Sequence, residues 1–354
     1  MNVAAGSSRD DADNGRRGLR PQLTQRLVRD IQRRYRLAEP AEIADLGGSV
    51  HLNLAWASEH GRVVVRVYRS HVSPGRLEAI QRARGVLAAG RVPTARIIES
   101  RAGTTFVTSD EHLVEVEEYV EYDAIMDDWE RLAAGMPLLG CVHSLLAGVR
   151  SDEPGVEPLY ANYVSPGQAL AGTQAGAARI RSWQPTAAEL GVAEDAERLA
   201  EVLQPAEAVF TPELPRQLVH GDFWHNNVCF RLGEPVLVAD LDFMGYRARV
   251  DDLALTLYFA LCELPADERG TQGPDRVAGL VRAYQNGLHD KLSAAERAAL
   301  PLAMARQPLW SIGGWVARLD DDLTARAHAA NCRSELALGL SIMASLDRWQ
   351  DAVR

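Results

Sequence analysis

The chain almost lacks lysine: of its 38 lysine and arginine residues, Lys291 is the only lysine. Any mechanism that requires a lysine ammonium elsewhere in the chain is therefore excluded. Cysteine is also sparse. The four cysteines, at positions 141, 229, 262 and 332, have neither metal-ligand spacing nor the pattern of a disulfide framework. This usage favours reduced thiols and a cytoplasmic protein.

Long apolar runs are absent as well, since no stretch approaches the ~20 residues that span a bilayer. Residues 1–18 are polar and lack the apolar stretch of a signal peptide, so we expect a disordered tail there. The net charge of −10 disfavours nucleic acid and anionic membranes as partners. With 354 residues, of which 47% are hydrophobic, the chain suits two packed lobes of a globular protein.

The first third of the chain switches between helical and strand-like patterns. Apolar residues at helical spacing predict a helix over 20–37 and a second one over 76–89, which Gly90 and Pro93 end. The predicted strands, of which the first two form a hairpin, are 50–56, 62–68, 96–99, 104–108 and 112–119. These patterns predict a small, mostly antiparallel sheet with one internal helix.

Helical patterns dominate after Tyr122, interrupted by two short apolar strands. We therefore predict an α+β fold with an N-terminal lobe over 19–116, a hinge over 117–122 and a helical C-terminal lobe over 123–354. The segment 154–185 is rich in Gly, Pro, Ser and Ala, and a functional loop or short helices are expected there.

An acid, an amide and a second acid occur in order within 218–240. Asp222 and Asn227 stand at the two ends of a short loop, and the apolar runs 228–230 and 236–239 can pair as a hairpin that returns Asp240 beside them. Phosphoryl transfer needs a carboxylate that orients the attacking hydroxyl, and oxygen ligands for Mg²⁺ on the nucleotide phosphates. Asp222 can supply the first, and Asn227 and Asp240 the second. The alternative is a turn-capping aspartate with two solvated polar residues.

The run 218–240 resembles the catalytic motif of aminoglycoside phosphotransferases and of the wider antibiotic-, choline- and homoserine-kinase-like superfamily. The resemblance extends over most of the chain, through the segments 47–49, 63–66, 139–143 and 251–254. It implies a protein-kinase-like fold with two lobes, a nucleotide-binding N-lobe, and an acceptor site in the C-lobe. It also implies that Asp252 steadies the catalytic loop.

The resemblance assigns the donor side of the site. Arg66 stands where the family has the basic residue that grips the nucleotide phosphates, and Glu78 is the acid expected to pair with it or to lie on the surface. Gly48 and Ser49 belong to a glycine turn that lacks the lysine-hydroxyl ending of a Walker loop, which is consistent with a flap over the nucleotide. The backbone near Glu117 and Tyr119 is expected to bind the purine.

Other assignments keep two interpretations. Asp242 shares a strand face with Asp240 and is either a further metal ligand or a solvated carboxylate. His225 either contacts the substrate or shapes the loop, and His220 packs it. The residues proposed for a cationic acceptor, each with a core or surface alternative, are Glu263, Trp310, Trp315 and Asp320.

The expected function is Mg²⁺-dependent transfer of the γ-phosphoryl group of ATP or GTP to a hydroxyl of an antibiotic, whether aminoglycoside-like, peptide or nucleoside, which inactivates it and confers resistance. A metabolic kinase acting on homoserine, choline or a sugar shares every one of these catalytic residues. A catalytically silent kinase-like binding protein is a third class, which the intact acid-amide-acid set disfavours. The sequence leaves a monomer and a homodimer equally open.

Overall fold

The structure, a computed structural model of the chain, describes residues 20–48, 51–59, 61–70, 72–150, 163–265, 273–319 and 321–354. Contacts divide the chain into two compact units. The first unit holds the described residues up to Glu78 together with Thr94–Glu121, and the second holds Ala79–Pro93 and the chain from Tyr122 onward. The boundaries of the predicted lobes stay a prediction. The contact-based division assigns the helix that begins at Pro74 to the second unit from Ala79 onward.

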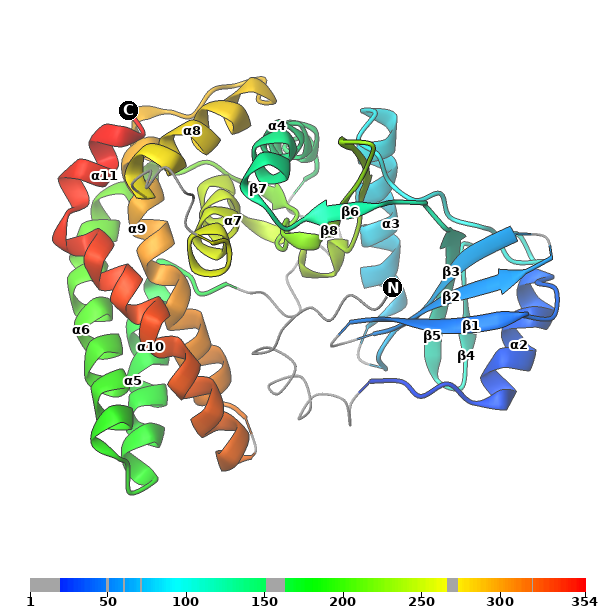
Figure 1. Cartoon of the computed structure of the whole chain (residues 1–354), viewed down its shortest axis with the longest axis horizontal. Helices are drawn as coiled ribbons and strands as arrows, with labels where there is room; N and C mark the ends of the chain where they lie inside the picture. The colour runs from blue at the N-terminus through cyan, green and yellow to red at the C-terminus, as the bar shows by residue number, and fades with distance from the viewer. Residues whose placement is uncertain are drawn as a thin grey trace. The chain divides into compact units, whose positions relative to one another are not determined.

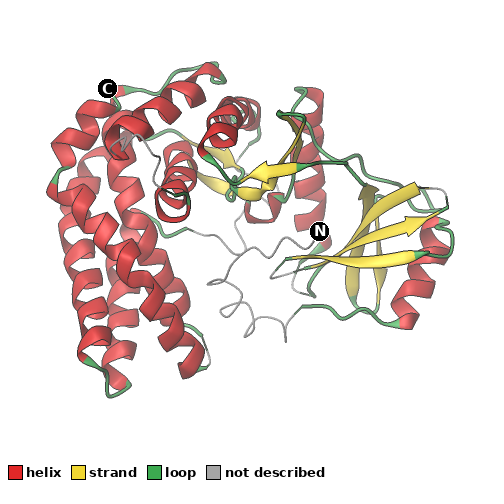
Figure 2. Cartoon of the chain, viewed as in Figure 1, coloured by secondary structure: helices red, strands yellow, loops and turns green. Residues whose placement is uncertain are grey.

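The first unit is built on an antiparallel sheet of five strands in the order β1-β2-β3-β5-β4 (Figures 1 and 2). Its elements are α2 (Gln25–Tyr35), β1 (Glu42–Gly47), β2 (Leu52–Ser58), β3 (Gly61–Val67), β4 (Phe106–Ser109) and β5 (His112–Glu118). Side chains alternate between the faces of a strand, so Leu54, Val65 and Val116 point to the same face. That face packs against Leu27 and Ile31 of α2 and forms the core of the unit.

Two local predictions for this unit are confirmed, and one is wrong. The helix expected over 20–37 is α2, which starts at the N-cap Thr24 and ends where Arg36 adopts a left-handed conformation. The hairpin is β2–β3. Residues 96–99 are not a strand, because only the single bridge Ile97↔Glu117 forms beside β5. β1 was missed because its mostly exposed residues lack an alternating apolar pattern.

The second unit contains two small sheets and most of the helices (Figure 2). The sheets have the strand orders β6-β8-β9 and β10-β7. The strands are β6 (Ala124–Met126), β7 (Arg216–Val219), β8 (His225–Arg231), β9 (Glu234–Val238) and β10 (Gly245–Ala248). The hairpin expected from the apolar runs 228–230 and 236–239 is confirmed as β8–β9.

Helices of the second unit pack around one large hydrophobic core. They are α4 (Trp129–Leu146), α5 (Pro166–Ser182), α6 (Ala187–Phe210), α7 (Arg249–Glu263), α8 (Gly273–Asn286), α9 (Ala294–Trp310), α10 (Asp322–Ala344) and α11 (Leu346–Ala352), with short turns η1 (Thr211–Glu213), η2 (Leu241–Phe243) and the π-helical η3 (Ser311–Val316). The long helices α5, α6, α9 and α10 lie side by side (Figure 1). The remaining helix, α3 (Pro74–Ala89), runs from one unit into the other.

The described part of the segment 154–185 is more regular than expected. It contains α5, a 17-residue helix that starts with Pro166 at its first position. Its glycines conceal the helix in the sequence but allow close packing, because a Cβ on Gly176 would lie 2.5 Å from the carbonyl oxygen of Ile312. Separately, no helix among the described residues is both long and apolar enough to cross a membrane.

Candidate active site

A tight loop between β7 and β8 carries Asp222. Gly221, just before it, has a φ of +85°, and a Cβ there would lie 2.0 Å from the carbonyl oxygen of Phe243. Only glycine combines this conformation with such a close approach. The turn that leads from β7 to Asp222 therefore needs glycine at position 221.

Asn227 holds the Asp222 side chain from the other end of the loop. Its Nδ2 group donates to the carboxylate Oδ2 of Asp222 at 2.9 Å and to the backbone oxygen of the same residue at 2.9 Å. Both amide hydrogens are thus directed at Asp222, and Oδ1 of Asn227 points the other way. Asn227 is buried and Asp222 is half-buried, so the carboxylate is oriented and still reachable.

Asp240 is brought next to this pair by the β8–β9 hairpin. The amide of Ala239 donates to the backbone oxygen of Asn227 at 2.9 Å. Asp240 follows with a φ of +60°, a left-handed conformation that is uncommon for a residue with a side chain, and its Oδ1 accepts from the amide of Asp242 at 3.3 Å. The structure therefore brings together the acid, the amide and the second acid that the sequence singled out.

The oxygens of Asn227, Asp240 and Asp242 suit a hard divalent cation. Magnesium is usually bound by one or two carboxylates together with phosphate oxygens of the nucleotide, rather than by a cage of protein side chains. The described residues contain no group of three or more His, Cys, Asp or Glu side chains that could hold a metal ion by themselves. Such a cation would neutralise charge on the phosphates.

His220 fixes the start of the loop and stays neutral. Its Nδ1 accepts from the amide of Asp222 at 3.3 Å, so Nε2 carries the proton and donates to the backbone oxygen of Ala239 at 3.0 Å. Burial lowers the pKa of His220 to about 4. The predicted packing role describes its position well, because one imidazole connects the strand before Asp222 to the strand before Asp240.

The first turns of α7 hold the backbone on both sides of Asp222. Oδ1 of Asp252 accepts from the amide of Gly221 at 2.9 Å, and the hydroxyl of Thr256 donates to the oxygen of Phe223 at 2.8 Å. Burial alone would raise the pKa of Asp252, but the hydrogen bond from His143, at 3.0 Å, and nearby positive charge keep that pKa below its ordinary value. Asp252 is therefore a buried, ionised anchor of the loop.

Buried ion pairs tie the same helix to its neighbours. Arg249 donates to Glu296 of α9 at 2.6 Å and 3.0 Å. Arg306 of α9 pairs with both Asp251 of α7 and Glu207 of α6. All these side chains are nearly inaccessible to solvent. The start of α7 is thus fixed from α6 and α9, while its Asp252 holds the loop that carries Asp222.

An aromatic group with one acid lies beside the loop. The indole nitrogen of Trp224 donates to Glu263, at the end of α7, at 3.0 Å. The Trp224 ring stacks on His225, with 6.2 Å between ring centroids, and also contacts Phe259. Glu263 is exposed and His225 is half-buried. The amide of Trp224 donates to the backbone oxygen of Asp222. His225 and Glu263, two of the residues predicted to bind an acceptor, therefore both contact a residue that is hydrogen-bonded to Asp222.

The two predicted tryptophans occupy another place in the helical unit. Trp310 and Trp315 contact each other edge to face, with 5.4 Å between centroids, and Trp315 also contacts His328 of α10. Both lie at the π-helical turn η3 and are half-buried. These ring contacts tie them to α10 rather than to β8. Asp320, the last of the predicted acceptor residues, lies outside the described residues.

Arg66 lies in the middle of the five-stranded sheet. It stands opposite Glu115 of β5 and Asn53 of β2 in the strand register. Arg66 and Glu115 are both buried, with the Arg66 guanidinium 5.4 Å from the centre of the Tyr68 ring, whose hydroxyl lies 3.5 Å from Glu115. Glu78, which was expected either to pair with Arg66 or to lie on the surface, is exposed on α3. Sequence reasoning thus overlooked Glu115, the acid in register with Arg66.

The remaining donor-side predictions fall around the same sheet. Gly48 has a φ of +102°, and a Cβ there would lie 2.7 Å from the Asn53 amide, so this turn requires glycine. Ser49 lies outside the described residues. Glu117 is buried in β5, and the ring of Tyr119 is covered by the guanidinium of Arg62 at 4.6 Å. Their proposed contact with a purine stays a prediction.

The sequence profile of the phosphotransferase enzyme family matches residues 47–297. The chain belongs to this family. No curated protein sequence matches it. Among solved structures, an amicoumacin kinase in complex with AMP-PNP and Ca²⁺ is 15% identical with a TM-score of 0.66, covering 89% of this chain and 93% of that one.

Two further solved structures have the same fold. An aminoglycoside phosphotransferase from Alicyclobacillus acidocaldarius is 16% identical with a TM-score of 0.66, covering 94% of this chain and 97% of that one. A microcompartment-associated aminopropanol kinase is 17% identical with a TM-score of 0.65, covering 93% and 98%. The predicted family and the α+β, protein-kinase-like fold are confirmed, and so is the prediction of a phosphotransferase enzyme.

Two residues of the phosphotransferase that support the loop were not predicted. His143 closes the segment 139–143, but nothing in that pattern indicates that its imidazole meets Asp252. Arg306 is one of many arginines, and its burial depends on two acids that lie 99 and 55 residues away in the chain. Contacts over such distances leave no local signal in a single sequence.

Proposed function

We propose that this phosphotransferase moves the γ-phosphoryl group of ATP or GTP to a hydroxyl of a small cationic antibiotic and so inactivates it. The observation that supports this is the Asp222 carboxylate, oriented by Asn227 at 2.9 Å, with Asp240 held beside them. A fixed carboxylate next to oxygen ligands for Mg²⁺ is the arrangement that phosphoryl transfer to an alcohol requires.

In the proposed reaction, the acceptor oxygen forms a bond to the γ-phosphorus as the bond to the β–γ bridging oxygen breaks. The proton of the acceptor hydroxyl passes to the Asp222 carboxylate, and the nucleoside diphosphate leaves. Arg66 would hold the phosphates, and Asn227 and Asp240, with Asp242 as the further ligand, would hold Mg²⁺. Positioning and charge stabilisation, rather than covalent catalysis, would account for the rate.

Charge near the loop favours a cationic acceptor. Glu263 is exposed at the end of α7, where its carboxylate accepts from the indole of the buried Trp224, and a protonated amine would be attracted by that carboxylate. The same chemistry suits a small amino alcohol, and a solved relative is an aminopropanol kinase. A metabolic amino-alcohol kinase is therefore the second candidate function.

The test measures nucleoside diphosphate release with ATP and with GTP, against one panel of aminoglycoside, peptide and nucleoside antibiotics and one of amino alcohols, homoserine and sugars. We expect turnover with a cationic antibiotic and a loss on the order of 10²–10⁴-fold in kcat for Asp222→Asn. Asp195→Asn, a surface change in an ion pair with Arg198, is the matched control and should keep full activity. Turnover only with amino alcohols would establish the second function, and activity that survives Asp222→Asn would refute the mechanism.

A further inference from the structure

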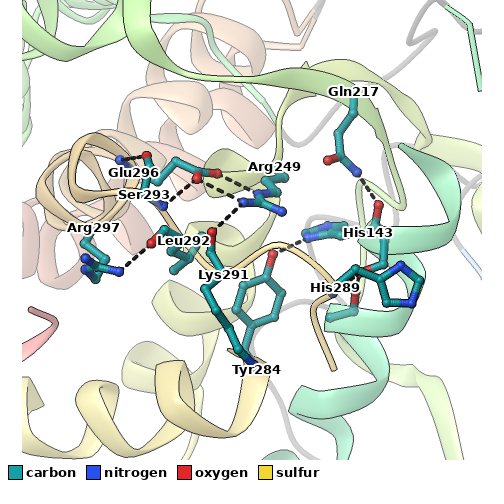
Figure 3. A network of polar contacts seen from close by, with 12 residues as sticks. His143, Gln217, Arg249, Tyr284, His289, Lys291, Leu292, Ser293, Glu296 and Arg297 are labelled. Carbon is teal, nitrogen blue, oxygen red and sulfur yellow. Dashed lines mark hydrogen bonds and ion pairs between the residues drawn. The ribbon is translucent and has the colours of Figure 1, made fainter. Parts of the chain in front are cut away.

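Three fully buried side chains connect α8 to the catalytic loop. The hydroxyl of Tyr284 lies 2.7 Å from Nδ1 of His143 on α4, as Figure 3 shows. Nε2 of His143 lies 3.0 Å from Oδ2 of Asp252 on α7. The other oxygen of Asp252 accepts from the amide of Gly221 at 2.9 Å. A path of three hydrogen bonds therefore runs from α8 to the residue before Asp222.

Each group on this path has a defined role as donor or acceptor. Burial raises the pKa of Tyr284 far above its ordinary value, so its hydroxyl keeps the proton and can donate it. The ionised Asp252 can only accept. Nε2 of His143 therefore donates to Asp252, and Nδ1 faces the Tyr284 hydroxyl on the other side of the ring. The contact with Tyr284 fixes the ring orientation in which Nε2 meets the carboxylate.

Close packing of α4 and α8 sets the reach of Tyr284. A Cβ on Gly140, one turn before His143, would lie 2.3 Å from the backbone oxygen of Tyr284, and one on Gly287 would lie 1.8 Å from the oxygen of Pro137. The two backbones can approach this closely only because both residues are glycine. Gln217 adds a contact from β7, since its Nε2 donates to the backbone oxygen of His143 at 2.6 Å (Figure 3).

We propose that Tyr284 is a positioning residue for phosphoryl transfer, which acts through His143 and Asp252 on the backbone that presents Asp222. The inference rests on the proposed function, because it explains how the loop is held for that reaction. Partners behind a reactive group commonly fix its orientation, and small misplacements of such a group cost rate rather than nucleotide affinity.

The experiment compares two buried tyrosines. Tyr284→Phe removes the hydroxyl on the path, whereas the control Tyr258→Phe removes a buried hydroxyl of α7 that donates to Glu335 of α10 at 2.6 Å. Hydrogen exchange of peptides spanning 218–224 is followed by mass spectrometry in the full-length protein. We expect Tyr284→Phe to speed exchange of the loop roughly fivefold, as the loss of one buried hydrogen bond implies, and the control to leave it unchanged.

A double-mutant cycle shows whether Tyr284 acts through His143. In a His143→Gln background, Tyr284→Phe should have no additional effect on loop exchange, because the path is already broken. With an acceptor in hand, Tyr284→Phe should lower kcat roughly tenfold and keep the KM for the nucleotide within about twofold. Equal loop exchange in both phenylalanine variants, or additive effects in the cycle, would overturn the proposal.

Exchange needs no acceptor, so the two proposals fail separately. If the protein shows no kinase activity but Tyr284→Phe speeds exchange of the loop, the result supports the role of Tyr284 and refutes the proposed function. If the protein is an active kinase but Tyr284→Phe leaves the exchange of the loop unchanged, the result supports the proposed function and refutes the role of Tyr284.

Discussion

Raising the pH from 5 to 8 is expected to lower the free energy of unfolding, because the buried Glu207 side chain loses its proton. This side chain of α6 is 4% exposed and shares the guanidinium of Arg306 with Asp251. Burial and the charge of Asp251 raise the pKa of Glu207 from 4.5 to about 7, although Arg306 acts in the opposite direction. Two buried carboxylates share one buried cation, so one of them keeps its proton to near neutrality.

The sign and size follow from the two pKa values. Because the folded-state value exceeds the unfolded-state value, the contribution of Glu207 to stability is fully present below pH 4.5 and is lost as the pH rises through about 7. The difference of about 2.5 units, 7 minus 4.5, corresponds to about 3 kcal/mol. About 2.5 kcal/mol of this should be lost between pH 5 and pH 8.

The assay is urea unfolding of the wild type and of Glu207→Gln at pH 5, 6, 7 and 8. Other carboxylates titrate in both proteins, so the difference in unfolding free energy isolates Glu207. Between pH 5 and pH 8, the unfolding free energy of Glu207→Gln should rise by about 2.5 kcal/mol relative to that of the wild type. Glu197→Gln on the same helix is the control. Arg181 donates to Glu197 and lowers its pKa below 4.5, so the contribution of Glu197 to stability is nearly complete by pH 5 and its difference should stay almost constant from pH 5 to pH 8. A Glu207 difference that is constant, or that falls as the pH rises, would refute the reasoning.

Three further changes test the loop and its supports. Gly221→Ala should abolish activity and loosen the loop, since its Cβ would meet the oxygen of Phe243 at 2.0 Å; phosphoryl transfer and loop proteolysis report this. Arg306→Leu should cost about 3–5 kcal/mol in urea unfolding at pH 8, because it leaves buried carboxylates without their cation, and should cost less at pH 5. Asp240→Asn should raise the Mg²⁺ concentration for half-maximal rate by roughly tenfold or more, measured in a metal titration.

The loop that carries Asp222 could be predicted because its signal is local. Asp222 and Asp240 lie just outside the two ends of the β8–β9 hairpin and Asn227 lies in β8, and the apolar runs of the two strands indicate how they pair. A short stretch of sequence thus contains both the chemical groups and the strands that bring them together. The hairpin β2–β3 and the helix α2 were found for the same reason, since their periodicity is complete within a few turns or residues.

Partners from distant segments could not be predicted. Glu78, on the next helix, was expected either to pair with Arg66 or to lie on the surface, and Glu115, which is 49 residues away and stands opposite the arginine in the strand register, was not considered. The register of a sheet is set by side-chain burial across several strands, and a single strand does not reveal it. Likewise, α5 contains several glycines, so its sequence resembles a loop. These glycines allow α5 to pack closely against η3, a contact that the sequence of α5 alone does not reveal.

The supports of the loop meet at the first turn of α7. Arg249, Asp251 and Asp252 lie within four residues, and each is bound to a different neighbour: Glu296 of α9, Arg306 of α9 with Glu207 of α6, and His143 of α4. Replacing a buried ion pair by apolar groups is often neutral or stabilising, so the buried ion pairs of Arg249 and Arg306 at one turn are poorly explained by stability alone. They instead restrict the helix to one orientation. That orientation is transmitted by Asp252 and Thr256 to the backbone on either side of Asp222. Variants that weaken these supports without unfolding the protein should therefore lower kcat more than they raise the KM for the nucleotide.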